Sequence, residues 1–170
     1  MTVGELDAAS REQARELLMA CCGAAPWVDA MLATRPFGDR ARLLAAADRA
    51  WGAMTDAELA DAIARHPRLG ESRAKAALSE RERAWSAGEQ SGVGAADADA
   101  RSALATGNED YERRFGHTFI LCATGLGSAD MLAALRQRLA NDATTERAIT
   151  AHELHKITRL RLEKLVGEGA

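Results

Sequence analysis

The sequence predicts an all-α fold, and three observations predict it. The 170 residues contain only three prolines, and the abundant alanine, leucine, arginine and glutamate favour helix over strand. Several segments repeat apolar residues at the spacing of one helix face. Capping residues stand where helices should begin, in several cases with glutamate or glutamine three residues later. We therefore expect one compact domain over residues 1–170, built from about eight helices including short ones.

Four helices are expected before residue 66. Each begins at a residue that caps a helix or favours its first turn, namely Ser10, Pro26, Asp39 and Thr55. The first should end at Gly23, because glycine readily takes the left-handed conformation of a C-cap. The second should end before Arg35 and Pro36, and the fourth should lead into His66. The third carries a buried stripe of Leu43, Leu44, Ala47 and Trp51.

Four more helices are expected after residue 66. They should begin at or near Ser79, Asp97, Ser128 and Thr145. The first should end around Gly88, the second around Phe115 and the fourth around Val166. The third carries an apolar stripe of Met131, Leu132, Leu135 and Leu139. Between the second and third lies an unbroken apolar run from Phe119 to Gly125. Its periodicity does not decide between a strand and a buried extended loop.

Composition and charge exclude several classes of protein. The formal net charge is -3, with acidic and basic residues interspersed, so the charge gives no sign of a nucleic-acid partner. No apolar stretch is long enough to span a bilayer, and no signal peptide is visible. Cys21 and Cys22 are adjacent and Cys122 stands alone, a spacing that suits neither a zinc site nor a disulfide framework. We expect a cytoplasmic protein without a metal, a membrane or a nucleic-acid partner.

His66 is the residue that points most directly to chemistry. Pro67 follows it and disfavours helical geometry at His66. A helix that ends here would hold the imidazole on a fixed, non-helical backbone. An imidazole titrates near neutrality and can give or take a proton without a cofactor. Two interpretations stay open: a histidine that only caps the helix, or the centre of a cofactor-free acid–base site.

A polar stretch from Trp85 to Gly92 offers partners for such a site. It holds the carboxylate of Glu89, the amide of Gln90 and the hydroxyl of Ser86. No GxSxG elbow surrounds Ser86, so a serine hydrolase is not indicated. The glycines of this region are Gly88, Gly92 and Gly94. They form no phosphate loop, because no lysine follows and the GxGxxG register is absent. They are expected instead to let backbone N–H groups approach a small ligand.

The last predicted helix carries three further candidates. His152 and His155 are three residues apart, a spacing that can present both to a metal. No third ligand is evident, and an exposed helix face is the simpler interpretation. Arg161 falls on the apolar stripe of this helix. It either snorkels at the edge of the stripe or meets an anion, such as a ligand carboxylate or Glu89. Arg159 lies on another face, where we expect it to be solvated.

Four segments together resemble one family. They are His66–Gly70 (His-Pro-Arg-Leu-Gly), Ser86–Gln90 (Ser-x-x-Glu-Gln), Tyr111–Ala123 (Tyr-x-x-Arg-Phe-Gly-x-x-Phe-Ile-x-Cys-Ala) and Glu153–Leu162 (Glu-Leu-His-Lys-Ile-x-x-Leu-Arg-Leu). Their order and spacing over nearly the whole chain resemble the OHCU decarboxylases. That family converts 2-oxo-4-hydroxy-4-carboxy-5-ureidoimidazoline (OHCU), an intermediate of urate breakdown, to (S)-allantoin.

The resemblance implies an all-α fold, a homodimer, a small-molecule substrate and no cofactor. It implies that His66 is the catalytic acid or base, that Pro67 lines the site, and that Ser86, Glu89 and Gln90 bind or orient the substrate. The chemistry of proton transfer also makes Glu89 a catalytic candidate, as a carboxylate that orients the imidazole. The remaining substrate-binding residues would be Phe119, Ile120, Leu121, Cys122, Ala123 and Arg161. The backbone groups of the first five would hold the amide edges of the substrate.

The implied reaction fits these residue types. The adjacent ring imine can take the electron pair that CO2 leaves behind, so the substrate is its own electron sink. The protein must bind the carboxylate, stabilise the enol-like intermediate and protonate one face. A competing class is a non-enzymatic helical protein that binds a small ligand or acts as a scaffold, because a fold does not fix a function. Convergence of His66, Glu89 and the Phe119 segment on one pocket would distinguish the two.

Overall fold

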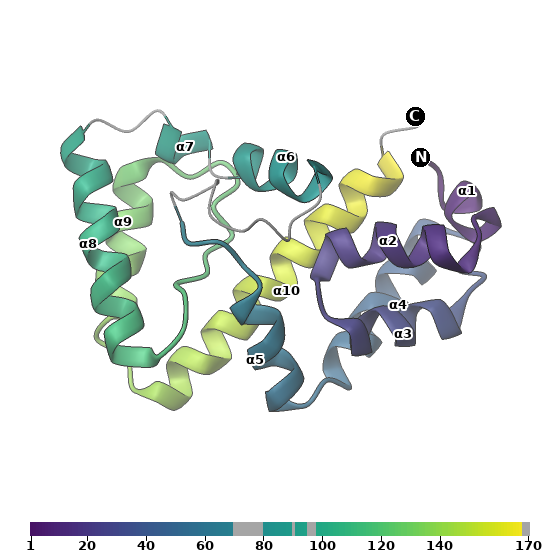
Figure 1. The fold of residues 1–170 in the computed structure, drawn as a ribbon, viewed down its shortest axis with the longest axis horizontal. Helices are drawn as coiled ribbons and strands as arrows, with labels where there is room; N and C mark the ends of the chain where they lie inside the picture. Colours follow the sequence, from purple (N-terminus) through teal and green to yellow (C-terminus); the bar gives the residue numbers. More distant parts are fainter. Residues whose placement is uncertain (70–79, 90, 95–97, 168–170) are drawn as a thin grey trace. The chain divides into compact units, whose positions relative to one another are not determined.

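The computed structural model describes residues 1–69, 80–89, 91–94 and 98–167 (Figure 1). All regular secondary structure in these residues is α-helical, which confirms the predicted fold class. The chain divides into two compact units: Met1–Ala62 with His155–Ala170 form unit 1, and Ile63–Leu154 form unit 2. Helices α5 (Asp56–Ala64) and α10 (Ala143–Gly167) contribute residues to both units. That residues 1–170 form a single domain stays a prediction.

Unit 1 contains parts of α5 and α10 together with α1 (Val3–Ala8), α2 (Arg11–Cys22), α3 (Ala25–Thr34) and α4 (Arg40–Gly52). Its predicted start signals are present. Ser10 Oγ accepts the Gln13 N–H at 3.1 Å to form a capping box, and Gly23 ends α2 with a φ of 78°. Asp39 and Thr55 likewise accept backbone N–H groups in the first turns of α4 and α5. Local capping chemistry therefore sets the helix boundaries here.

Unit 2 contains α6 (Glu80–Glu89), α7 (Ser91–Gly94), α8 (Ala98–Phe115) and α9 (Ser128–Arg138). Helices α8 and α9 pack side by side (Figure 1). One hydrophobic cluster joins them to two connecting segments, through Leu69, Leu104, Tyr111, Phe119, Ala123, Met131 and Leu135. Gly107 allows the close approach of the two helices, because a Cβ at this position would collide with the side chain of Leu135.

Some details differ from the prediction. The buried residues of α4 are Leu43, Ala46, Ala47 and Ala50, while Leu44 and Trp51 of the predicted stripe are only half-buried. Ser128 is the first residue of α9, and Gly127 precedes it without a side-chain cap. Helix α10 begins earlier than predicted, because Asp142 Oδ1 accepts the backbone N–H groups of Thr144 and Thr145 at 3.0 and 2.9 Å.

Two short helices, α1 and α7, were not predicted. A capping box opens α1, since Thr2 Oγ1 accepts the N–H of Glu5 at 3.2 Å and the Glu5 carboxylate accepts the N–H of Thr2. Sequence analysis could have found this signal, which has the same form as the one at Ser10. The predicted helix starts at Ser79 and Asp97 lie outside the described residues.

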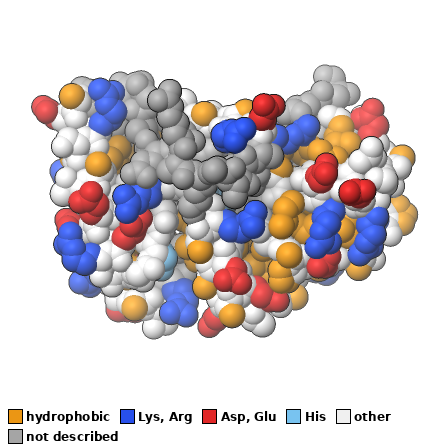
Figure 2. Space-filling view, viewed as in Figure 1, with side chains coloured by type: hydrophobic (Ala, Val, Ile, Leu, Met, Phe, Trp, Pro, Cys, Tyr) orange, Lys and Arg blue, Asp and Glu red, His pale blue; other side chains and the backbone are white. Residues whose placement is uncertain are grey.

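The surface follows the mixed charge of the sequence. Acidic and basic side chains are interspersed on the face shown in Figure 2, and no large hydrophobic residue in the described ranges is exposed. No described helix has the length and hydropathy of a membrane span. No disulfide joins the three cysteines: Cys21 and Cys22 are buried, and Cys122 is half-buried.

Candidate active site

His66 lies two residues after the end of α5, outside the helix as its sequence context predicts. The helix ends at Ala64, and the backbone N–H of His66 donates to the carbonyl oxygen of Ile63 at 3.0 Å. The His66 side chain is 9% exposed, and Pro67 is buried. The imidazole is therefore held in the interior on a non-helical backbone.

The residues after Pro67 are fastened to α8. Arg68 donates two hydrogen bonds to the carboxylate of Glu112, at 2.7 and 2.5 Å, and such a paired contact fixes orientation as well as distance. Asn108 Nδ2 donates to the carbonyl oxygen of Leu69 at 2.9 Å. Leu69 itself enters the hydrophobic cluster of unit 2. These contacts hold the segment that carries His66 against α8.

Helix α6 turns both of its candidate residues inward. Ser86 is 3% exposed and Glu89 is 7% exposed. Their positions differ by three, so they share one face of the helix. Trp85 is buried beside them, and the guanidinium of Arg81 lies 5.7 Å from the centre of its ring. A carboxylate rarely lies in the interior without a specific interaction. Gln90, the third candidate of this segment, lies outside the described residues.

The apolar run after α8 is a buried loop, not a strand. Phe119, Ile120 and Ala123 are nearly inaccessible, while Leu121 and Cys122 are half-buried. Phe119 and Ala123 belong to the same hydrophobic cluster as Leu69. The structure thus joins the loop and the segment after His66 through one core.

Two backbone groups of this loop already bind protein side chains. The carbonyl oxygen of Ile120 accepts from Arg138 Nη1 at 2.5 Å, and the N–H of Cys122 donates to Glu153 Oε2 at 2.8 Å. Both side chains are buried. The carbonyl oxygen of Ala123 also accepts a backbone hydrogen bond, from the N–H of Leu126 at 3.0 Å. The prediction that the loop backbone holds a ligand is therefore restricted to its remaining N–H and C=O groups.

A buried ionic cluster around Arg138 supports the loop. The Arg138 guanidinium pairs with the carboxylate of Glu146 at 2.5 Å, and Tyr111 donates to the same carboxylate. Burial alone would raise the pKa of Glu146, but hydrogen bonds from Arg138, Tyr111 and Asn141 hold that pKa below its ordinary value. Burial, reinforced by the bond to Glu146, raises the pKa of Tyr111.

This cluster was not predicted from the sequence, although the sequence carries one signal for it. Arg138 falls three residues after Leu135, on the apolar stripe of α9, and an arginine on such a stripe needs an anionic partner. Glu146 is that partner, in the first turn of α10.

Arg161 is buried, and the snorkelling interpretation is wrong. Its side chain is 5% exposed, and its Nη1 donates to the carbonyl oxygen of Ala20 at 3.5 Å. Arg161 belongs to unit 1, whereas the other predicted site residues that the structure describes belong to unit 2. Its contact with a ligand carboxylate stays a prediction.

The histidine pair of α10 does not lie on one exposed face. His152 is exposed, but His155 stacks on Trp51 with ring centres 5.0 Å apart and bonds to Asp48 at 2.9 Å. Arg159 pairs with the same carboxylate at 2.5 Å, so it is not simply solvated. Nowhere in the described ranges do three His, Cys, Asp or Glu side chains gather as metal ligands would.

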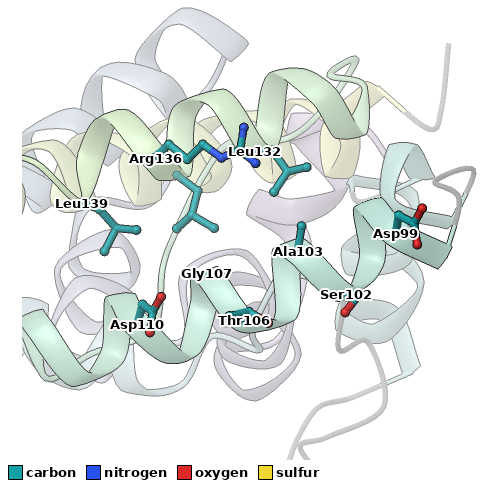
Figure 3. A pocket seen from close by; sticks show the side chains of 10 residues that line it. Asp99, Ser102, Ala103, Thr106, Gly107, Asp110, Leu132, Arg136 and Leu139 are labelled. Carbon is teal, nitrogen blue, oxygen red and sulfur yellow. The ribbon is translucent and has the colours of Figure 1, made fainter.

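A groove between α8 and α9 lies apart from the predicted site residues (Figure 3). Its lining includes Leu132, Leu135 and Leu139 from α9, together with the charged residues Asp99, Asp110 and Arg136. None of the predicted catalytic or substrate-binding residues lines this groove.

The glycines near α6 and α7 were expected to let backbone N–H groups approach a small ligand, and Gly92 has a different role. A Cβ on Gly92 would collide with the backbone carbonyl of Leu126 and lie 3.0 Å from the Met131 side chain. Its missing side chain thus makes room for another backbone segment of unit 2 and not for a ligand. The surroundings of Gly88 are open, because no heavy atom lies within 4 Å of a Cβ placed there.

Solved structures share this all-helical fold. A crystal structure of OHCU decarboxylase in the presence of (S)-allantoin matches 94% of this chain and 100% of that chain, with a TM-score of 0.77 and 29% identity. A crystal structure of (S)-allantoin synthase matches 98% of this chain and 54% of that chain, with a TM-score of 0.71. At 18% identity the second match shows the fold alone.

Curated relatives point to the same family. The uric acid degradation bifunctional protein TTL of Arabidopsis thaliana is 30% identical over 150 residues, which are 88% of this chain and 46% of that protein. The 2-oxo-4-hydroxy-4-carboxy-5-ureidoimidazoline decarboxylase of Amia calva is 35% identical over 85 residues, 49% of each chain. The chain spans about half the length of these relatives.

Residues 7–163 match the family model of OHCU decarboxylase. The chain belongs to the OHCU decarboxylase family, as its four sequence segments indicated.

Proposed function

We propose that this protein decarboxylates 2-oxo-4-hydroxy-4-carboxy-5-ureidoimidazoline to (S)-allantoin in urate breakdown, without a cofactor. The observation that carries the proposal is the family match over residues 7–163, because this range includes every predicted catalytic and substrate-binding residue. The similar structure crystallised in the presence of (S)-allantoin supports it.

The substrate supplies much of the chemistry in this proposal. Breaking the bond to the carboxylate releases CO2 and leaves an electron pair on the ring carbon that bears the hydroxyl. That pair moves toward the adjacent ring C=N bond, whose nitrogen takes up the charge, and an enol results. A proton delivered to one face of the ureido-bearing carbon then gives one enantiomer. In the same conversion the enol hydroxyl loses its proton to become the carbonyl, and the charged ring nitrogen takes up a proton. The protein has to hold the carboxylate, stabilise the enol and direct this proton.

His66 and Glu89 are the residues proposed to handle protons. Both are nine-tenths buried and both belong to unit 2. An imidazole exchanges protons near neutral pH, and a carboxylate can orient it and stabilise its charged form. In the proposal His66 is the acid or base, and Glu89 is its carboxylate partner.

Substrate binding is assigned to the polar face of α6 and to the loop. Ser86 lies on the buried face of α6 with Glu89. The amide edges of the substrate would be bound by backbone groups of the Phe119–Ala123 loop other than the Ile120 and Ala123 carbonyls and the Cys122 N–H, which bind protein groups. Pro67, Gln90 and Arg161 complete the proposed set of substrate contacts.

The test generates the substrate in place from urate, with urate oxidase and hydroxyisourate hydrolase supplied. Absorbance follows loss of the intermediate, and circular dichroism follows the chiral product. We expect this protein to speed the loss of the intermediate and to give optically active allantoin. A racemic product formed at an unchanged rate would exclude the decarboxylase function.

We also propose that the protein is a homodimer, on the basis of the family resemblance, and that it is cytoplasmic, on the basis of its cysteine spacing. Light scattering during size-exclusion chromatography should give twice the mass of one chain, and cell fractionation should find the protein with the cytosol. A monomer at assay concentrations would contradict the homodimer. A protein that fractionates with membranes would contradict the cytoplasmic location.

A further inference from the structure

Arg138 contacts both the backbone and a side chain of the Phe119–Ala123 loop. From α9, its Nη1 donates to the carbonyl oxygen of Ile120 at 2.5 Å. Its guanidinium carbon lies 4.6 Å from the centre of the Phe119 ring, within the range of a cation–π contact. Arg138 is 5% exposed, so both contacts are shielded from water.

The other nitrogen atoms of Arg138 are bound to buried groups on α8 and α10. Nε donates to Glu146 at 2.7 Å. Nη2 donates to Thr150 Oγ1 at 2.8 Å and to the Tyr111 hydroxyl at 3.3 Å. Each of these partners is fully buried. Because a guanidinium presents its N–H groups in one rigid plane, these bonds fix the orientation of the nitrogen that holds Ile120.

A second charged side chain holds the loop two residues further on. Glu153 Oε2 accepts the Cys122 N–H at 2.8 Å, and Glu153 is 8% exposed. The loop is therefore fastened by buried charges at the Ile120 carbonyl and at the Cys122 amide. Its remaining backbone groups are positioned by these two anchors.

We propose that Arg138 is a positioning residue of the reaction: it fixes the binding loop without touching the substrate. The inference rests on the proposed function, in which this loop binds the substrate. The N–H groups of the Arg138 guanidinium bind protein acceptors, so Arg138 acts on the reaction through its contacts with Ile120 and Phe119. A shift of about 1 Å in a positioning group can cost on the order of a hundredfold in rate.

Two variants test the proposal. Arg138→Lys keeps the charge beside Glu146 but loses the planar fork, so one ammonium cannot satisfy all the present acceptors. The double variant Arg138→Met with Glu146→Gln removes both charges at similar volume, a replacement that buried ion pairs often tolerate. Arg136→Lys is the matched control, because Arg136 is an exposed residue of the same helix.

The readouts are KM, kcat and the enantiomeric excess of allantoin, corrected for spontaneous decay. Circular dichroism and thermal melting give the folded fraction. We expect KM to rise about tenfold or more in both Arg138 variants and enantiomeric excess to fall, while Arg136→Lys resembles the wild type. A purely structural role would lower the amount of active enzyme and leave KM and enantiomeric excess unchanged.

The outcomes separate the two proposals. An active wild-type protein whose Arg138 variants keep its KM and enantiomeric excess would overturn the positioning role alone. An inactive wild-type protein would overturn the proposed function and, with it, the role of Arg138. Should Arg138→Lys fail to fold, the KM and enantiomeric excess of the double variant test the positioning role.

Discussion

At the scale of single residues, the buried polar side chains of unit 2 fall into two groups. Arg138, Glu146 and Thr150 bind one another, and in the proposal above this group holds the binding loop without touching the substrate. His66 and Glu89 are also buried, but they belong to the segments assigned to catalysis. Variants of the second group should therefore alter turnover more than stability.

We expect His66→Ala to lower turnover about a hundredfold or more, because a positioned proton transfer is lost. Steady-state rates in the coupled assay measure the loss, and far-ultraviolet circular dichroism checks the fold. His152→Ala is the control, since His152 is exposed and should retain full turnover. A loss under about threefold in a folded His66→Ala protein would reduce His66 to a capping residue.

Glu89→Gln tests whether a carboxylate is needed and not only a polar group. The amide keeps the shape and much of the hydrogen-bonding capacity but removes the charge. We expect a large fall in turnover with little change in melting temperature. Glu163→Gln is a suitable control, because Glu163 makes a partly exposed ion pair with Arg40 at 3.6 Å. Near-normal turnover of Glu89→Gln would make Glu89 a neutral substrate ligand and leave the proton chemistry to His66.

At the scale of elements, helix boundaries depend on local chemistry and contacts between elements do not. The box at Ser10 and the glycine stop at Gly23 could be predicted, because their partners lie within a few residues. Gly92 was misinterpreted, since the backbone it makes room for is that of Leu126. The residues that hold the loop were also missed, because contacts between residues distant in the sequence leave no local pattern. Arg138 and Ile120, for example, are eighteen positions apart.

Two glycines of unit 2 provide a matched test of this packing. Gly92→Ala should lower the melting temperature, because its Cβ would collide with a backbone carbonyl that cannot rotate away. Gly88→Ala should leave stability unchanged or raise it by about 0.5–1 kcal/mol, because its surroundings are open and alanine favours helix. Thermal melts of the two variants give the comparison. Equal melting temperatures would show that the Leu126 segment yields to the added methyl group.

At the scale of the whole molecule, acid should remove stability from both units. The pKa of Asp48 in unit 1 is lowered, because hydrogen bonds from Arg159 and His155 outweigh its desolvation. The pKa of Glu146 in unit 2 is lowered by Arg138 and its neighbours. A carboxylate whose pKa is lower in the folded state adds stability above its unfolded pKa. That stability is lost as the pH falls through the folded pKa.

We therefore expect the free energy of unfolding to decline as the pH drops below about 4.5, the ordinary range of a glutamate. Glu146 should dominate, because it is fully buried, whereas Asp48 is screened by solvent. Urea titrations at successive pH values measure the slope of the free energy of unfolding against pH. The double variant Arg138→Met with Glu146→Gln should make this decline with pH less steep, whereas the control Asp61→Asn, at an exposed residue of α5, should not. An unchanged slope in the double variant would place the acid sensitivity elsewhere.

The unequal burial of the three cysteines gives the molecule a built-in chemical reporter. Cys21 and Cys22 are 0% and 1% exposed, so alkylating reagents should not reach them in the folded protein. Cys122 is half-buried within the proposed binding loop. We expect iodoacetamide to label Cys122 first and (S)-allantoin to slow that labelling, as mass spectrometry of the digested protein would record. Labelling of Cys122 at the same rate with and without allantoin would mean that the ligand does not cover the loop.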